Sequence, residues 1–419
     1  MAQDPAAQQQ QLYDRMVRQP TNYNVTLEYV RLATDRNDYE AAIGALERLL
    51  YYNPSLGQVK YQLGTLYYRL RAFEMARRYF QEALASPDTD AGSRASIAGY
   101  LADMESQTKP SRFSGFAQVG LRYQTNGNFA PAGDIIRFGA QNLLLPTTSA
   151  RRPDTNVFGL VALNHDWDLE NQRGDVIETR FAGYLTDQFH FTDLNVALYE
   201  LSIGPRMAIA PELLPGATIK PYLLGGQTWV GGATYQNSAG AGFVTQFPIG
   251  VNFTFGPTFE WRHVDFNLQE TVPTSVFNSG DWYTTGLAAS AALGPGARAD
   301  ARGFYRRGRA SLAFQTFKQW IVETALTFDV TSPFVSVAQN VSISPYVRYI
   351  KTDFDTPDPF IDPAIARADD QWVFGTKIDM AFTKTFGLSA TVQYDHTASS
   401  LPNYRQNNLS VLAGPTVRF

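Results

Sequence analysis

The chain ends Leu409-Ser410-Val411-Leu412-Ala413-Gly414-Pro415-Thr416-Val417-Arg418-Phe419, and every odd-numbered residue in this stretch is apolar. The even-numbered residues are mostly small or polar. Alternation with a period of two over about ten residues predicts a strand with lipid on one side and a polar interior on the other. We therefore expect this stretch to be the last strand of a transmembrane β-barrel.

The terminal residue adds a second signal. Phe419, with Val417, Pro415 and Ala413 before it at steps of two, resembles the C-terminal signal by which bacterial outer-membrane barrels are recognised for assembly. This resemblance implies an outer-membrane location and the outer-membrane barrel assembly machinery as a partner.

The composition fits a large exported barrel. The 419 residues include no Cys, which excludes disulfides and Cys-bound metals. The 22 Tyr, 28 Phe and 6 Trp suit the aromatic girdles at the two membrane interfaces. We find no run of about 18 apolar residues that would form a transmembrane helix. The formal net charge of −4 argues against nucleic acid as the main partner.

The N-terminal quarter of the chain has a helical period. Residues 39–50 carry apolar side chains at helical spacing, and Asn53-Pro54 ends this helix because a residue before proline is disfavoured in the α conformation. Prolines at positions 20, 54 and 87 recur 34 and 33 residues apart. This is the spacing of tetratricopeptide repeats.

The second repeat resembles the tetratricopeptide family closely. At the expected offsets it has Leu63, Gly64 and Tyr67 on its first helix and Ala76, Phe80 and Ala83 on its second. The first repeat keeps Ala42, Leu46 and Pro54, but has Val30 and Ala33 where Gly and Tyr are usual. We expect two repeats and a final helix near residues 92–107 that caps a short solenoid.

A groove for a partner is expected on the concave face of these repeats. An extended peptide or an amphipathic segment could lie there. The predicted groove residues are Asn24, Leu27, Arg31 and Thr34 on one helix and Gln58, Tyr61, Thr65 and Tyr68 on the next.

After residue 111 the period changes to two. The alternation predicts strands near residues 112–123, 157–169, 175–186, 194–209, 218–230, 244–254, 258–266, 283–293, 298–309, 319–329, 341–352, 371–382, 388–395 and 408–419. Gly256-Pro257 is expected to be a tight turn between two of them. The count of fourteen is even, as a single-chain bacterial barrel requires, and short connections alternate with long ones.

The polar residues of these strands are expected to face the lumen. Those predicted to project inwards are Gln118, Arg122, Arg180, Asn252, Glu260, Arg262, Arg348, Lys377 and Asp379. Their mixed charge predicts no clear ion preference.

The predicted organisation is a two-domain α+β protein. Residues 1–11 would be a disordered mature N-terminus with an added initiator Met, and residues 12–107 a periplasmic domain of tetratricopeptide repeats. Residues 108–111 would be a linker, and residues 112–419 an outer-membrane β-barrel of about 14 strands.

The sequence contains no recognisable catalytic set. The four His residues fall near strand ends or in predicted loops, and the neighbours Asp395 and His396 would point to opposite faces of one strand. No Walker loop, dinucleotide fingerprint or metal spacing is present. We therefore expect a protein that is not an enzyme and needs no cofactor or metal.

Periplasmic repeats followed by a barrel of about fourteen strands resemble the surface lipoprotein assembly modifier family. The resemblance implies that the repeats capture cargo and that a protein or lipoprotein passes through or along the barrel to the cell surface. An exopolysaccharide-export porin of the cellulose or poly-glucosamine type is the alternative, and an outer-membrane anchor for periplasmic partners is a third possibility. The implied partners are outer-membrane lipids and a periplasmic cargo.

Overall fold

The computed structural model describes residues 5–36, 38–171, 173–268, 275–331 and 340–419. The chain divides into two compact units, Met1–Lys109 and Pro110–Phe419. No helix in the described part of the chain is long and apolar enough to cross a membrane.

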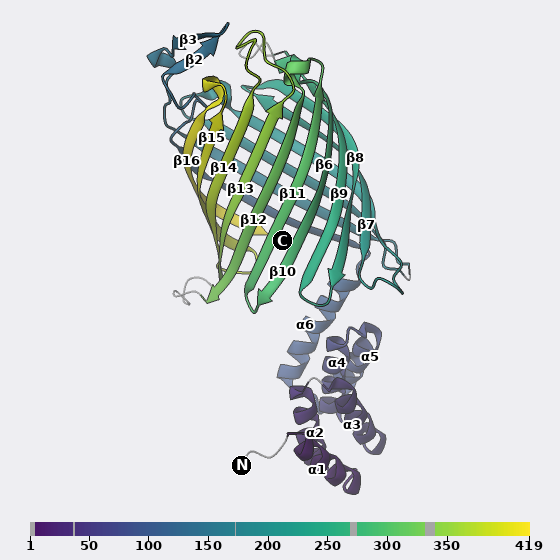
Figure 1. Ribbon diagram of the computed structural model, residues 1–419. Coiled ribbons are helices and arrows are strands. Elements are labelled where there is room, and N and C mark those ends of the chain that lie inside the picture. Colours follow the sequence, from purple (N-terminus) through teal and green to yellow (C-terminus); the bar gives the residue numbers. More distant parts are fainter. Residues whose placement is uncertain (1–4, 37, 172, 269–274, 332–339) are drawn as a thin grey trace. The chain divides into compact units, whose positions relative to one another are not determined.

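Six helices form the first unit within the described residues (Figure 1). They are α1 (Pro5–Arg18), α2 (Tyr23–Asp35), α3 (Tyr39–Tyr52), α4 (Gly57–Arg69), α5 (Phe73–Ala85) and α6 (Ala91–Thr108). Side chains cap three of the helix starts: Asn22, Asp38 and Asp90 each accept a hydrogen bond from a backbone N–H in the first turn of the helix that follows.

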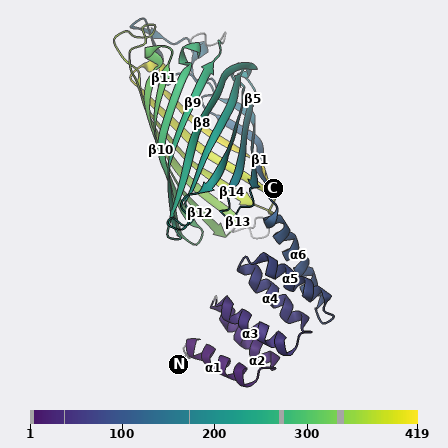
Figure 2. The same ribbon diagram turned by 90° about the vertical axis from the view of Figure 1, so that its right-hand side faces the viewer.

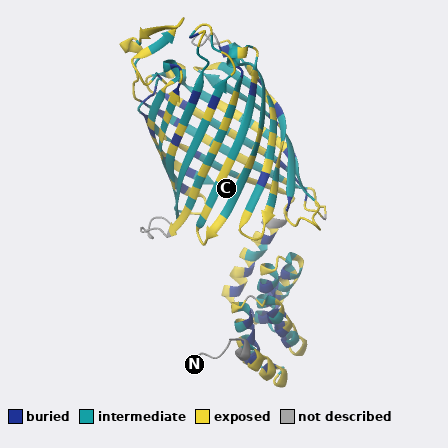
Figure 3. Ribbon diagram, viewed as in Figure 1, coloured by how far each residue is buried: buried dark blue, intermediate teal, exposed yellow. Residues whose placement is uncertain are grey.

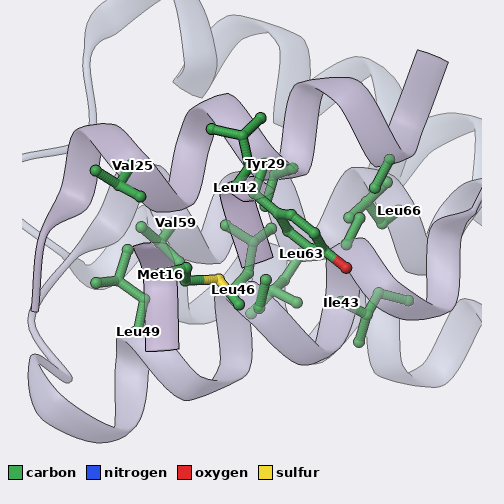
Figure 4. Close-up of a cluster of buried hydrophobic side chains, with 14 residues drawn as sticks. Leu12, Met16, Val25, Tyr29, Ile43, Leu46, Leu49, Val59, Leu63 and Leu66 are labelled. Atoms are coloured by element: carbon green, nitrogen blue, oxygen red, sulfur yellow. The ribbon is translucent and has the colours of Figure 1, made fainter. Parts of the chain in front are cut away.

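Two apolar clusters hold the helices together. The first joins α1 to α4 and includes Leu12, Leu46 and Leu63, which are nearly or fully buried (Figure 4). The second joins α5 and α6 around Phe80, which is fully buried. A Cβ atom on Gly64 would lie 2.5 Å from Cδ1 of Phe80, so glycine is needed for the ring of α5 to lie against α4.

The expected disordered N-terminus is wrong for residues 5–11. These residues belong to α1, and residues 1–4 lie outside the described part of the chain. The segment is helical because Leu12 and Met16, only 4% and 3% exposed, anchor it in the first cluster, and Pro5 fits the first position of a helix.

The second unit is a closed antiparallel barrel of fourteen strands, and the predicted fold class is confirmed (Figures 1 and 2). Its strands are β1 (Ser111–Gln124), β4 (Asp154–Asp168), β5 (Val176–Gln188), β6 (Val196–Ala208), β7 (Thr218–Val230), β8 (Ala233–Ile249), β9 (Phe253–Phe266), β10 (Gly280–Gly294), β11 (Ala297–Ala310), β12 (Phe317–Thr331), β13 (Asn340–Phe354), β14 (Ala368–Ala381), β15 (Phe386–Ser399) and β16 (Gln406–Arg418). Each strand pairs with its neighbour in sequence, and β16 pairs with β1 to close the sheet.

The two ends of the barrel differ in their connections. β1 starts and β16 stops at the same end, which we call the turn end; there the strands are joined by segments such as 250–252, 295–296 and 382–385. The opposite end, the loop end, carries the longer connections 125–153 and 355–367. The connection 125–153 contains a hairpin that the sequence did not predict, formed by β2 (Ile135–Phe138) and β3 (Gln141–Leu144).

Exposure alternates along the barrel strands (Figure 3). On β1, Val119, Leu121 and Tyr123 are 54%, 56% and 47% exposed, whereas Gln118 and Gln124 on either side of them are 8% and 1% exposed. The outer face is therefore apolar and the inner face polar, which is the reverse of a protein that folds in water.

The predicted turn at Gly256-Pro257 is wrong. Both residues lie inside β9, and the chain reverses at residues 250–252, where Gly250 has a φ of +61°. Gly256 is required inside the strand because a Cβ there would lie 1.7 Å from the carbonyl oxygen of Thr245 on β8. Asn252 consequently lies in the turn and is not part of the lumen wall.

Candidate functional site

A groove runs between α2 and α4 in the helical unit. It encloses about 420 Å³ and is lined by Leu27, Val30, Arg31, Thr34 and Asp35 of α2 and by Tyr61, Gln62, Thr65, Leu66 and Arg69 of α4. These positions recur at three and four residues, so they occupy one face of each helix.

The floor of the groove is apolar. The Oγ1 atoms of Thr34 and Thr65 donate hydrogen bonds to carbonyl oxygens of their own helices, at 2.7 and 3.0 Å. With those hydroxyl groups used, the two threonines add little polarity to the apolar side chains Leu27, Val30 and Leu66. The rim carries two arginines, Arg31 and Arg69, and one aspartate, so its formal charge is positive.

Five of the eight residues predicted to line a partner groove are in this one: Leu27, Arg31, Thr34, Tyr61 and Thr65. The other three are elsewhere. Asn24 is exposed at the start of α2, and Gln58 accepts a hydrogen bond at 3.2 Å from Ser93 of α6. The ring of Tyr68 packs on Tyr100 with centroids 4.8 Å apart, and its hydroxyl donates to Asp103.

The prediction missed Gln62. Its Oε1 atom is buried and has no hydrogen-bond partner within the described residues, and the side chain lines the groove. A buried carbonyl oxygen without a partner is unfavourable, and a donor from a bound peptide backbone would satisfy it. Gln62 directly follows Tyr61 and precedes Thr65 by three residues, so helical spacing alone places it beside the two predicted residues.

A network of two tyrosines and one carboxylate joins α3, α4 and α5. The hydroxyls of Tyr67 and Tyr79 donate to Oε1 of Glu47 at 2.8 and 3.2 Å, and their rings are stacked with centroids 5.5 Å apart. Burial, followed by the hydrogen bond to Glu47, raises the pKa of Tyr67 to about 12. The network fixes α4, one wall of the groove, to α3 and α5, and none of its three side chains lines the groove.

Ion pairs line the barrel lumen at two levels. At the turn end, Glu178 contacts Arg180, Arg206 and Lys220 at 3.0, 2.7 and 2.9 Å. Across the lumen at the same end, Asp379 contacts Lys377 and Arg418 at 3.0 and 3.4 Å.

Further pairs lie nearer the middle of the strands. Arg262 contacts Glu260 at 3.0 Å and Glu200 at 2.7 Å, and Arg348 contacts Glu323 at 2.6 Å. Because cations and anions alternate around the wall, the lumen is polar and hydrated but has no dominant sign of charge.

Apart from Asn252, the residues predicted to line the lumen are on the inner face. Gln118 donates from Nε2 to the carbonyl oxygen of Ser389 at 3.2 Å, and Arg122 approaches the hydroxyl of Tyr184 at 3.5 Å. Arg180, Glu260, Arg262, Arg348, Lys377 and Asp379 line cavities that open into the lumen. Among the described residues, no group of three or more His, Cys, Asp or Glu side chains could hold a metal ion.

No protein-family model and no curated protein sequence matches this chain. It is similar to a bacterial polysaccharide outer-membrane secretin, with 11% identity over 72% of this chain and 98% of that chain and a TM-score of 0.35. A second match is an outer-membrane channel from Pseudomonas putida F1, with 12% identity, 73% and 96% coverage and a TM-score of 0.36. A third, MamA MSR-1, is 21% identical over 24% of this chain and 58% of that chain, with a TM-score of 0.21.

Proposed function

We propose that this protein is an outer-membrane export channel whose helical unit binds a peptide segment in the periplasm. The observation that carries the proposal is the groove between α2 and α4, with its apolar floor and basic rim. Such a groove suits an extended or amphipathic peptide that offers apolar side chains and at least one carboxylate. The barrel of the same chain supplies a polar passage.

Two features support the location in the outer membrane. The outer face of the barrel is apolar, and a closed barrel leaves no unpaired strand edge in lipid. Phe419 exchanges backbone hydrogen bonds with Gly115 at 2.9 and 3.2 Å, so the terminal residue takes part in closing the sheet. This role is consistent with its resemblance to an assembly signal.

The chain topology supports a periplasmic helical unit. Residue 110 leads directly into β1, which begins at the turn end. In bacterial outer-membrane barrels the short turns face the periplasm and the long loops face outwards. The helical unit is thus attached on the side from which cargo for export would come.

The number of strands limits the cargo. Eight strands enclose just enough space for side chains, and sixteen to eighteen leave an aqueous channel. Fourteen strands with charged side chains on the inner face therefore fit an extended polymer better than a folded domain. A polypeptide or the extended part of a lipoprotein is our first candidate, in line with the family resemblance, because the groove is suited to peptides.

The second candidate cargo is a polysaccharide. One observation favours it: a pocket inside the loop end of the lumen combines aromatic rings, amides and a buried carboxylate, as described below. In that case the groove would bind a periplasmic enzyme of the polymer pathway and not the cargo.

The groove can be tested by export in living cells. Replacing Arg31, Tyr61 and Arg69 together by alanine removes the basic rim and one aromatic wall. The fully buried residues of the two clusters stay in place, although the ring of Tyr61 also packs against Phe80. We expect normal amounts of the variant in the outer membrane and at least a tenfold loss of surface display of the product encoded next to this gene, protein or polysaccharide.

The matched control replaces Arg36 and Tyr51, which are exposed outside the groove, by alanine and should export normally. If the groove variant also exported normally, the groove would have no part in export, and anchoring of periplasmic partners would become the better function.

A further inference from the structure

A pocket of about 320 Å³ lies in the loop end of the lumen. Its walls come from the ends of β12, β13 and β14 and from the short 3-10 helix Pro402–Tyr404. Phe317 and Phe354 face each other on β12 and β13, and Gln371 and Thr397 face each other on β14 and β15. The pocket is within the size range of sites that hold small molecules or single units of a polymer.

Asp369 lines this pocket, and one of its two carboxylate oxygens is buried without a partner. Asp369 is 8% exposed, and its Oδ2 atom accepts a hydrogen bond from Nε of Arg367 at 2.8 Å. Its Oδ1 atom is buried and has no hydrogen-bond partner within the described residues. Buried polar atoms are rarely left unpaired, because the loss of water is then uncompensated. A hydrogen-bond donor on a ligand that reaches Oδ1 would remove this cost.

The pocket has no net charge. Arg367 neutralises Asp369, and the guanidinium is itself held over the rings of Tyr404 and Phe354, 3.4 and 4.8 Å from their centroids. The attraction of a cationic ligand to Asp369 is offset by its repulsion from Arg367, and the reverse holds for an anionic ligand, so a net charge on the ligand gives little advantage here. A neutral ligand with hydroxyl groups meets no such penalty.

The remaining walls suit a ring with one polar edge and one apolar face. Gln319 is oriented by donating from Nε2 to Thr352 at 3.0 Å, and Gln406 by donating from Nε2 to the carbonyl oxygen of Phe129 at 2.9 Å. Both amides are thus fixed before a ligand arrives, which lowers the entropy cost of binding. The rings of Phe317 and Phe354, with centroids 5.9 Å apart, supply an apolar wall.

We propose that this loop-end pocket binds one sugar ring of a neutral carbohydrate. Sugar hydroxyls donate to Oδ1 of Asp369 and bond to the fixed amides, while the C–H face of the ring lies against Phe317 and Phe354. The site does not depend on the groove of the helical unit, so it goes beyond the proposed peptide-binding function. It would serve equally for a chain that leaves through the lumen or for a sugar that enters from outside.

Calorimetric titration of the full-length protein tests the site directly. The protein is kept in a detergent without a sugar headgroup, and the probes are cellohexaose and maltohexaose. We expect at least one probe to bind with a dissociation constant of about 1 mM or tighter. Hexaethylene glycol, which has ether oxygens but no sugar ring, should not bind. Absence of binding by both oligosaccharides would overturn the proposal.

Two variants locate the binding. Asp369→Asn removes the charge of the acceptor, and Gln319→Ala removes one of the two fixed amides without touching the ion pair; each should weaken binding about tenfold. The matched control is Asp379→Asn, which removes another lumen carboxylate paired with cations, but at the turn end. It should bind as the unaltered protein does. Unchanged affinity in both loop-end variants would contradict the assignment.

A second arm separates the two sources of sugar. Cellohexaose coupled to a dextran too large for the lumen is added to intact cells that produce the unaltered protein or Asp369→Asn. Binding that depends on Asp369 shows that the site is open to the outside. If free cellohexaose binds and the dextran-coupled form does not, the site is reached only from within the lumen. Either result supports a sugar site. Loss of export in the groove variant with retained sugar binding would separate this site from the proposed peptide function.

Discussion

The helical unit and the barrel place their apolar residues on opposite sides. In the helical unit Leu46, Leu63 and Phe80 are completely buried, whereas charged side chains such as Glu28 and Arg31 are exposed. In the barrel Val119 and Leu121 are more than half exposed, and polar residues such as Gln118 and Ser389 are buried. The comparison shows that one chain is built for two solvents, water around the helices and lipid around the strands.

The largest effect is expected in the core of the helical unit. Phe80→Ala removes a fully buried ring that packs against Gly64, and it should lower the free energy of unfolding of that unit by about 3–5 kcal/mol. Chemical denaturation followed by the helical circular-dichroism signal measures this. The barrel should remain heat-modifiable on gels, and Tyr51→Ala, at a side chain 81% exposed, should change neither signal. Joint loss of helices and barrel would show that the units do not fold independently.

A somewhat smaller effect is expected on the outer face of the barrel. Val119 lies near the middle of β1 and is 54% exposed. Val119→Arg should destabilise the barrel in lipid by about 2–4 kcal/mol, because the charge must leave water for hydrocarbon. Arg122→Gln, on the inner face of the same strand, should cost about 1 kcal/mol or less. Reversible unfolding in lipid vesicles measures the free energy of unfolding of both variants. If both lowered it equally, β1 would not face lipid at this depth.

The smallest effect concerns alkaline pH in the helical unit. The pKa of Tyr67 is raised from 10.0 to about 12 in the folded protein by burial and by Glu47. The protonated hydroxyl thus contributes stability that is complete below pH 10 and is lost as the pH rises towards 12. Tyr67→Phe should flatten this part of the profile of helical stability against pH, and Glu47→Gln should shift the tyrosinate absorbance to lower pH. A profile unchanged in both variants would exclude the network as the cause.

The strands of the barrel could be predicted from the local pattern of residues. Alternation with a period of two is a property of a few neighbouring residues, and it predicted a strand at each of the fourteen places. Most ends were displaced by a few residues, but the strand predicted at 244–254 missed the first half of β8, which begins at Ala233, and ran through the turn at 250–252. The same local reading failed at Gly256-Pro257, a pair that usually marks a turn. Glycine is needed there because the carbonyl of Thr245 on the neighbouring strand β8 approaches its Cα closely. That contact is with another strand and is not contained in the local sequence.

The residues that line the groove could be predicted only in part. Helical spacing placed Leu27, Arg31, Tyr61 and Thr65 on the correct face, since a period of 3.6 residues is set by the helix alone. It also selected Tyr68 and Gln58, which contact α6. Which side of a helix meets a third helix depends on how the helices pack, and one helix pattern does not contain that information.

The sequence by itself determined that the chain has a helical part and a barrel, because the periods of apolar residues follow directly from the geometry of helices and strands. Only the tertiary structure decided where the loop-end pocket lies. Phe317, Asp369 and Tyr404 are far apart in the chain and come together because β12 to β16 pair side by side and the connection between β15 and β16 lies against their ends. The buried, unpaired Oδ1 of Asp369 follows from that arrangement, since burial depends on neighbours that no local pattern specifies.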